Sequence, residues 1–227
     1  MSDPGDGARR RPRRRGKAQL RALLEQRDLS GVLEEALAGR TQRVLRNLTS
    51  LMFDRDEDVR WRAAVALGRV AGLLSRDELE DVRELVRRLL WWMNDESGAL
   101  MWNAPEAIAE ILVNVDELVE EYATILGHYL VEEPFERGTH WAVARLGRRA
   151  PEAFRVRLGV LRESLRDPDP SVRGYAILAL HAIGARGEVE AVEALRDDEG
   201  ALKRFDYDRL TMVPVTVGEI AAEVLGS

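Results

Sequence analysis

The chain of 227 residues contains no cysteine and only three histidines. The lack of cysteine excludes disulfides, thiolate nucleophiles and metal sites with cysteine ligands. No apolar run approaches the length of about 18 residues that a membrane-spanning helix needs. No apolar stretch follows the arginines of the amino terminus, so no secretory signal is predicted and a cytoplasmic location is expected. Aromatic residues make up only 6% of the chain, yet five of them are tryptophan.

Signatures of common catalytic sites are also missing. The chain has neither a glycine-rich phosphate loop nor a Gly-x-Ser-x-Gly nucleophile motif. None of the histidines, His128, His140 and His181, is followed by glutamate. Acidic pairs such as Glu132-Glu133 fall in expected loops, where such runs are usually solvated. The sequence therefore predicts no catalytic residue, no metal ligand and no cofactor, and it favours a binding protein over an enzyme.

The charge is distributed unevenly along the chain. Residues 1–17 hold seven basic and two acidic residues, whereas the remaining 210 residues hold 27 basic and 38 acidic ones. The amino-terminal segment thus carries a net charge of +5 and the body −11. Residues 1–17 also lack the apolar residues that could offset the entropy of folding, so a disordered basic arm is predicted. Such an arm is either simply solvated or makes weak contact with nucleic acid or anionic lipid.

A short phrase recurs along the body of the chain. Residues 58–70 match residues 171–183 at a shift of 113, with Val59, Arg60, Ala63 and Leu67 on Val172, Arg173, Ala176 and Leu180. Two degenerate copies lie between them, and the successive shifts are 41, 38 and 34 residues. Such spacing is typical of repeats built from a pair of helices, with a period of roughly 40 residues.

Each phrase fits the second helix of a pair, since its apolar residues fall on one helical face. A longer apolar helix is predicted before each copy. The units are expected at about 41–73, 77–113, 116–149 and 151–186. Capping boxes predict helix starts at Ser75 with Glu78, more loosely at Asn114 with Glu117, and at Thr216 with Glu219. The fold class is therefore all-α, a solenoid of about four stacked helix pairs.

The two ends of the body depart from the repeat. Residues 18–39 are predicted to form one or two short helices that cap the stack. Residues 188–227 form a divergent carboxy-terminal cap, in which residues 202–215 lose the helical period and are expected to be extended chain or a short hairpin. Residues 18–227 are thus predicted to form one continuous stack.

The phrases Asp-x-Asp-x-Asp-Val-Arg-x-x-Ala-x-x-Ala-Leu-Gly (54–68) and Asp-Pro-Asp-Pro-Ser-Val-Arg-x-x-Ala (167–176) resemble HEAT repeats. They look most like the subgroup called phycobilisome-lyase HEAT-like repeats, over about residues 41–187. The resemblance implies a right-handed superhelix whose second helices line the concave side. Members of that family are mainly scaffolds for protein partners. Some are bilin lyases, some hydroxylate a modified lysine, and some similar proteins handle alkylated DNA.

Aromatic residues stand near the start of the second helix in every unit. Trp61 aligns with Trp102, and Trp141 and Tyr175 occupy the next column. If second helices line the concave side, these rings form a ladder there. Aromatic rings beside polar groups suit a partner-binding groove, and the alternative is that they pack between units. The predicted partner-binding residues are Trp61, Trp92, Trp102, Asn103, Glu106, His140, Trp141 and Tyr175.

The leading hypothesis is a non-catalytic scaffold or adaptor that binds a protein or peptide on its concave face. A first alternative is a lyase-like HEAT enzyme or chaperone acting on a chromophore or a modified protein, with residues 91–106 and His140 as its site. A second alternative is nucleic-acid binding, expected only through residues 1–17. The sequence predicts no oligomeric state.

Overall fold

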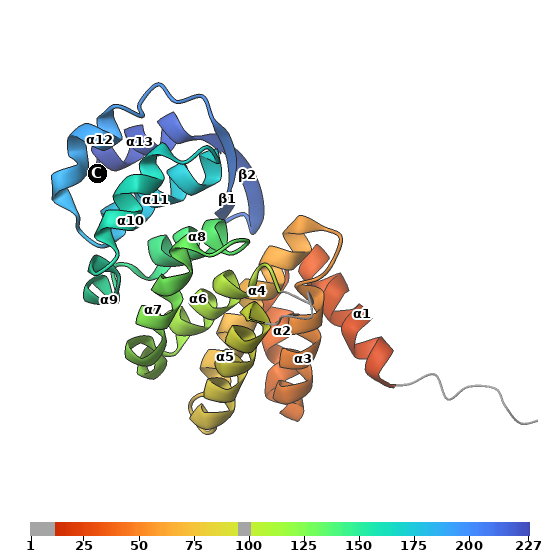
Figure 1. Cartoon of the computed structure of the whole chain (residues 1–227). Coiled ribbons are helices and arrows are strands. Elements are labelled where there is room, and N and C mark those ends of the chain that lie inside the picture. Colours follow the sequence, from red (N-terminus) through yellow and green to blue (C-terminus); the bar gives the residue numbers. More distant parts are fainter. Residues whose placement is uncertain (1–11, 95–100) are drawn as a thin grey trace, which may run out of the picture.

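The computed structural model describes residues 12–94 and 101–227. It is an all-α solenoid with one small hairpin near its carboxy-terminal end (Figure 1). The helices are α1 (Pro12–Glu25), α2 (Leu29–Glu35), α3 (Thr41–Leu51), α4 (Glu57–Leu74), α5 (Leu79–Met93), α6 (Ala104–Asn114), α7 (Val119–Gly127), α8 (Glu136–Leu146), α9 (Pro151–Arg155), α10 (Leu158–Glu163), α11 (Pro170–Ala182), α12 (Val189–Glu193) and α13 (Val217–Leu225). The strands are β1 (Ala201–Asp206) and β2 (Thr211–Thr216). Short helical turns cover Ala36–Arg40, Asp116–Leu118, His128–Val131, Ser164–Arg166 and Arg186–Glu188.

The helices form two rows. Helices α3, α5 and α7, and then α9 with α10, are the first helices of the successive pairs. The second helices α4, α6, α8 and α11 pack against one another in chain order. The first helix of the fourth pair is broken between Arg155 and Leu158, although Phe154 and Leu161 on either side of the break are both buried.

Small residues allow the second helices to approach closely. A side chain at Gly68 of α4 would lie 2.3 Å from the backbone oxygen of Glu110 in α6, so no larger residue fits there without a shift of the backbone. The apolar face predicted for this helix is buried throughout: Val59, Ala63, Ala66, Leu67 and Val70 are at most 1% exposed. The repeated phrase therefore specifies both the buried face and the spacing between helices.

Side chains cap several helices, and the predicted capping box at Thr216 is confirmed. Asp56 accepts hydrogen bonds from the backbone of Asp58 and Val59 at the start of α4, and Asp169 accepts one from Ser171 at the start of α11. Thr216 and Glu219 form a complete capping box at α13.

Two of the predicted capping boxes are wrong. Helix α5 begins at Leu79, and Ser75 donates its hydroxyl hydrogen to Gly72 O at the end of α4. Asn114 is the last residue of α6, and its amide donates to Glu110 O. Both residues instead lie at the carboxy-terminal end of the preceding helix: Ser75 directly follows α4, and Asn114 closes α6.

The amino-terminal cap begins earlier than the sequence predicts. Residues 12–17, assigned to the disordered arm, lie in α1, and Lys17 donates a hydrogen bond of 2.6 Å to the Ser50 hydroxyl of α3. Residues 1–11 of the predicted arm lie outside the described residues. Binding of nucleic acid through the arm stays a prediction.

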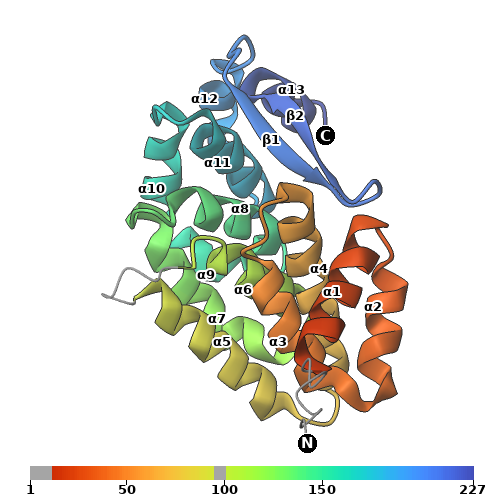
Figure 2. The same cartoon turned by 90° about the vertical axis from the view of Figure 1, so that its right-hand side faces the viewer.

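The carboxy-terminal cap contains the predicted hairpin. Strands β1 and β2 pair antiparallel from Ala201 with Thr216 to Asp206 with Thr211. The hairpin does not stay at the end of the stack. It crosses the row of second helices, with β1 against α11 and β2 against α4 (Figure 1, and Figure 2 from the side). None of the helices in the described ranges is long and apolar enough to cross a membrane.

Candidate partner-binding surfaces

The aromatic residues of the second helices lie beneath the hairpin. The rings of Trp61 and Phe205 are stacked with their centroids 5.6 Å apart, and Trp141 meets Trp61 edge-on at 4.9 Å. Tyr207 in turn meets Phe205 at 5.1 Å. As a result Trp141 is 6% exposed and Tyr175 only 3%. Phe205 and Tyr207 of the hairpin thus occupy the surface of the second helices where the sequence predicts a partner.

The tip of the hairpin is held by Asp58 and Arg62. Asp58 accepts hydrogen bonds from the Thr211 hydroxyl at 2.6 Å and the Met212 amide at 2.8 Å. Burial opposes ionisation of Asp58, but these hydrogen bonds outweigh it and hold its pKa below the usual range. Arg62 is buried and donates to Asp58 and to the backbone oxygens of Leu24 and Leu210. One guanidinium therefore joins the amino-terminal cap, α4 and the hairpin.

A second ion pair, between buried Glu110 and half-buried Arg145, also holds the turn of the hairpin. Glu110 of α6 is 1% exposed and accepts hydrogen bonds from Arg145 Nε of α8 at 3.0 Å and from the Tyr207 hydroxyl. The Arg145 guanidinium also lies 4.3 Å from the centre of the Tyr207 ring. Burial lowers the pKa of Arg145, but the nearby Glu110 charge reverses this, so the net shift is upward. The buried Glu110 carboxylate thus has both a cationic and a hydroxyl partner, as a buried charge needs.

Glu106 in the first turn of α6 differs from these paired acids. Its side chain is buried, and its Oε2 atom has no hydrogen-bond partner among the described residues. Burial raises the pKa of Glu106 to about 7, because the ionised form loses its hydration. The carboxyl group faces a pocket of about 430 Å³ beside the hairpin, to which Trp61, Arg137 and Tyr175 also contribute.

His140 is an internal residue. It is 1% exposed, with Nδ1 2.8 Å from the Glu136 backbone oxygen and Nε2 2.8 Å from the Ser164 hydroxyl. Burial lowers the pKa of this imidazole, which favours its neutral form. The lyase-like alternative requires His140 at a surface shared with residues 91–106, and the structure places the ring in the interior instead.

The remaining predicted aromatic residues lie on a different part of the molecule. Trp102 stands just before α6 and is 70% exposed, and Asn103 beside it donates a 2.8 Å hydrogen bond to the Met52 backbone oxygen. Phe53, next to Met52, is 60% exposed, as is Trp91 in the last turn of α5. Trp92 is half-buried, with Arg88 over its ring. We call Phe53, Trp91, Trp92 and Trp102 the aromatic edge, because all four lie where a first helix turns into a second helix.

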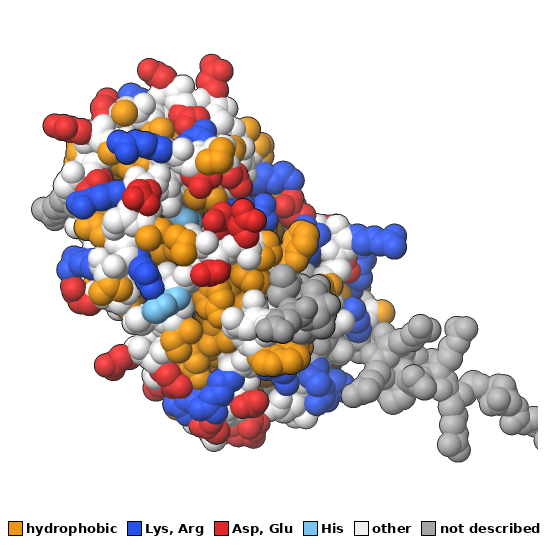
Figure 3. Space-filling model, viewed as in Figure 1, with side chains coloured by type: hydrophobic (Ala, Val, Ile, Leu, Met, Phe, Trp, Pro, Cys, Tyr) orange, Lys and Arg blue, Asp and Glu red, His pale blue; other side chains and the backbone are white. Residues whose placement is uncertain are grey.

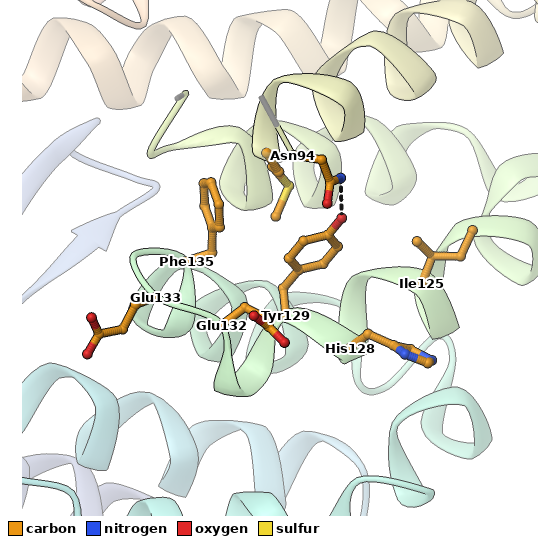
Figure 4. A pocket seen from close by; sticks show the side chains of 8 residues that line it. Asn94, Ile125, His128, Tyr129, Glu132, Glu133 and Phe135 are labelled. Carbon is orange, nitrogen blue, oxygen red and sulfur yellow. Dashed lines mark hydrogen bonds between the residues drawn. The ribbon is translucent and has the colours of Figure 1, made fainter. Parts of the chain in front are cut away.

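A pocket of about 470 Å³ adjoins the carboxy-terminal end of α5 (Figure 4). Tyr129 projects across it and accepts a hydrogen bond of 2.6 Å from the Asn94 amide, and Phe135 meets the Tyr129 ring edge-on at 6.0 Å. Glu132, Glu133 and His128 stand at its rim (Figure 4). Hydrophobic side chains gather over α5 to α7 on this face of the molecule (Figure 3).

No protein-family model matches the chain. The chain is 31% identical to an uncharacterised protein of Archaeoglobus fulgidus over 183 residues, which cover 78% of this chain and 93% of that protein. The chain belongs to the family of this archaeal protein. The family relationship thus extends over most of the solenoid.

Two designed helical proteins show the same fold. An engineered protein of known crystal structure has a TM-score of 0.57 at 20% identity, with 96% of this chain and 92% of that chain covered. A designed armadillo repeat protein in complex with the peptide (KR)4 has a TM-score of 0.52 at 17% identity, with 91% and 98% covered. At these identities the likeness concerns the fold alone. It is the fold of an armadillo repeat protein, an α-solenoid of stacked helices, while the likeness to HEAT repeats and to their phycobilisome-lyase subgroup stays a prediction.

The predicted partner-binding residues of this family member fall into three groups in the structure. The first group lies beneath the hairpin and consists of Trp61, Glu106, Trp141 and Tyr175. The second lies at or beside the aromatic edge and consists of Trp92, Trp102 and Asn103, and His140 is internal. The predicted ladder is therefore not one exposed concave surface. Sequence analysis missed Phe53 and included Trp91 only in the site of the lyase-like alternative, because the exposure of these side chains has no periodic signal. It missed Phe205 and Tyr207 too, although their i, i+2 spacing in the expected hairpin was a usable sign.

Proposed function

We propose that this chain is a non-catalytic scaffold that binds a segment of a partner protein along its aromatic edge. The observation that carries the proposal is the exposure of Trp102, Trp91 and Phe53 at 70%, 60% and 60%. Large exposed aromatic side chains cost hydration free energy in an isolated protein and are the commonest hot spots of protein interfaces. The hairpin covers the concave surface that the sequence favours for this role, so the edge is the better place for a partner.

The chemistry of this surface favours a partner segment that is both apolar and basic. The aromatic edge supplies apolar contact area, and the adjoining pocket has Glu132 and Glu133 at its rim. Glu136 lies close by, and burial together with the charges of Asp167, Glu133 and Asp169 raises its pKa, which reflects a concentration of negative charge there. The designed armadillo repeat protein of the same fold holds a basic peptide, (KR)4, which agrees with this preference.

Affinity capture from the native cell with the full chain tests the proposal. We compare the unchanged chain with the double variant Trp91→Ala/Trp102→Ala. The control is Leu37→Ala/Val156→Ala, which truncates two side chains that are 70% and 72% exposed in other parts of the fold. We expect the edge variant to lose specifically recovered partners, each lost hot spot weakening binding by about 2 kcal/mol or more. Recovery that is the same with the edge variant as with the unchanged chain would contradict the proposal.

A further inference from the structure

The pocket beside the hairpin contains a charged residue that the repeat does not require. The repeat shifts place Glu106 in a column with Val65, Ala144 and Leu178, all of them apolar. Val65 is 1% exposed, so the position is a core position in the first unit. Packing alone therefore calls for an apolar side chain where α6 carries a carboxylate. Burying such a group without a partner is costly, which indicates a use other than stability.

Lys203, Glu57 and Tyr175, three other polar residues of the pocket, have partners within the fold. Lys203 Nζ of β1 lies 2.5 Å from the Glu57 carboxylate of α4. The Tyr175 hydroxyl of α11 donates to the Lys203 backbone oxygen at 2.6 Å. Arg137 of α8 lowers the pKa of Glu106 through its charge, yet it donates no hydrogen bond to Oε2.

The Glu106 carboxyl is also held in place from behind. A side chain at Gly138 would stand 2.7 Å from Oε2, so the absence of one at this position of α8 makes room for the carboxyl. The Glu106 side chain lines the pocket, and its enclosed Oε2 atom lacks a hydrogen-bond donor, so an incompletely satisfied carboxyl group stands in a fixed position at the pocket wall. A ligand that donates a hydrogen bond from a charged nitrogen is its natural complement.

We propose that this pocket receives a lysine or arginine side chain of the partner segment, with Glu106 as the residue that recognises its charged end. The apolar side chains of Leu202, Met212 and Pro214 line the pocket and suit the methylene stem of such a side chain. Glu106 follows Trp102 by four residues, so an apolar residue on the aromatic edge and a basic residue in the pocket can belong to one segment. That the basic side chain belongs to a partner segment rests on the proposed function, whereas the preference of the pocket for a cation does not.

Cation binding at Glu106 is coupled to proton release. The cation favours the ionised carboxylate, and below pH 7 it must displace the proton that burial keeps on the group. Arg137, Lys203, Glu57 and Tyr175 are the other titratable groups that line the pocket. With a single competing proton, affinity should rise roughly tenfold between pH 6 and pH 8.

The test uses the full chain and two small probes, Nα-acetyl-lysine methylamide and its norleucine counterpart, which has the same stem without the ammonium. Carboxyl carbon NMR follows Glu106 during each titration. We expect the lysine probe to bind, to lower the pKa of Glu106 and to bind more tightly at pH 8 than at pH 6. Glu106→Gln should abolish this binding. Glu120→Gln, which removes an exposed charge on α7, should leave it unchanged.

Three results would overturn the inference. They are equal binding of the norleucine probe, retained binding in Glu106→Gln, and preferential binding of an acidic probe that is lost in Arg137→Ala. The melting temperature of Glu106→Gln must match that of the unchanged chain at pH 6, where Glu106 is mostly neutral, so that loss of binding is not loss of fold. Failure of the aromatic edge in the capture experiment leaves the lysine titration unaffected, so the two proposals fail separately.

Discussion

At the scale of single residues, Glu106 makes stability depend on pH. Its pKa is raised from 4.5 to about 7 in the folded chain, so the native state holds an extra proton between these values. The free energy of unfolding should therefore fall as pH rises through this window, by roughly 3 kcal/mol in total from this group. We expect Glu106→Gln to lack this loss and to exceed the unchanged chain in stability at pH 8. Urea denaturation of both proteins at pH 5 and pH 8 measures it, and parallel pH profiles would contradict it.

The tryptophans should differ sharply in their contributions to stability. Trp141 is 6% exposed and contacts Trp61, so Trp141→Ala leaves a cavity and should cost about 3–5 kcal/mol. Trp102 is 70% exposed, so Trp102→Ala should change stability by less than about 0.5 kcal/mol. Chemical denaturation monitored by far-UV circular dichroism measures both. A large loss in Trp102→Ala would mean that this ring packs in the fold and is not free for a partner.

At the scale of elements, only some of the capping motifs in the sequence form caps in the structure. At the start of α13 the predicted capping box is formed. The Thr216 hydroxyl accepts a hydrogen bond from the Glu219 backbone amide, and the Glu219 carboxylate accepts one from the Thr216 backbone amide. Thr216→Ala should therefore cost about 1 kcal/mol. Ser75→Ala is the matched control and should cost less than about 0.5 kcal/mol, because Ser75 caps no helix start. Equal losses in thermal or chemical denaturation would contradict this difference.

The hairpin shows how one element changes the role of another. Without β1 and β2, the second helices would present Trp61, Trp141 and Tyr175 as the open groove that the repeat suggests. Phe205 and Tyr207 instead complete the aromatic cluster, and two acids, half-buried Asp58 and buried Glu110, bind groups of the hairpin. The carboxy-terminal cap therefore covers the row of second helices as well as the end of the stack. It leaves the aromatic edge as the main exposed aromatic surface of the described residues.

At the scale of the whole molecule, the hairpin connects units that are distant along the stack. In an open solenoid each unit contacts only its neighbours, and unfolding can proceed unit by unit. Here Arg62 joins Leu24 and Leu210, and Lys203 pairs with Glu57, so both ends of the stack are linked. The chain should accordingly unfold in one cooperative transition.

Arg62→Ala tests this linkage. Arg62 is buried but Asp58 is partly exposed, so losing the charge-assisted hydrogen bonds of Arg62 should cost about 1.5–3 kcal/mol, and it releases the tip of the hairpin. We expect tryptophan fluorescence and far-UV circular dichroism to give coincident transitions for the unchanged chain and separate ones for Arg62→Ala. Hydrogen exchange at the Met212 amide, bonded to Asp58, should accelerate as well. Arg69→Ala, an exposed arginine on the same helix, is the control. Coincident transitions in Arg62→Ala would show that the hairpin does not couple the units.

The local and periodic features of this protein can be predicted from its sequence alone. Helical periodicity identified the buried face of α4, Gly68 and its neighbouring alanines indicated close helix packing, and Thr216 with Glu219 marked the start of α13. These signals depend on residues close together in the chain, so they can be read without knowing the fold. The same local signal was wrong at Ser75 and Asn114, which lie at the carboxy-terminal ends of α4 and α6 and not at the start of the next helix.

Which aromatic residues of the repeat are exposed to a partner depends on tertiary contacts. Trp61, Trp102, Trp141 and Tyr175 occupy similar positions in the repeat, yet Trp102 is exposed and Tyr175 is buried. The difference arises from contacts between residues far apart in sequence, such as Tyr175 with Lys203 and Arg62 with Leu210. Repeat periodicity specifies how neighbouring units stack. The path of the hairpin across the stack depends on these long-range contacts, and no local pattern encodes them.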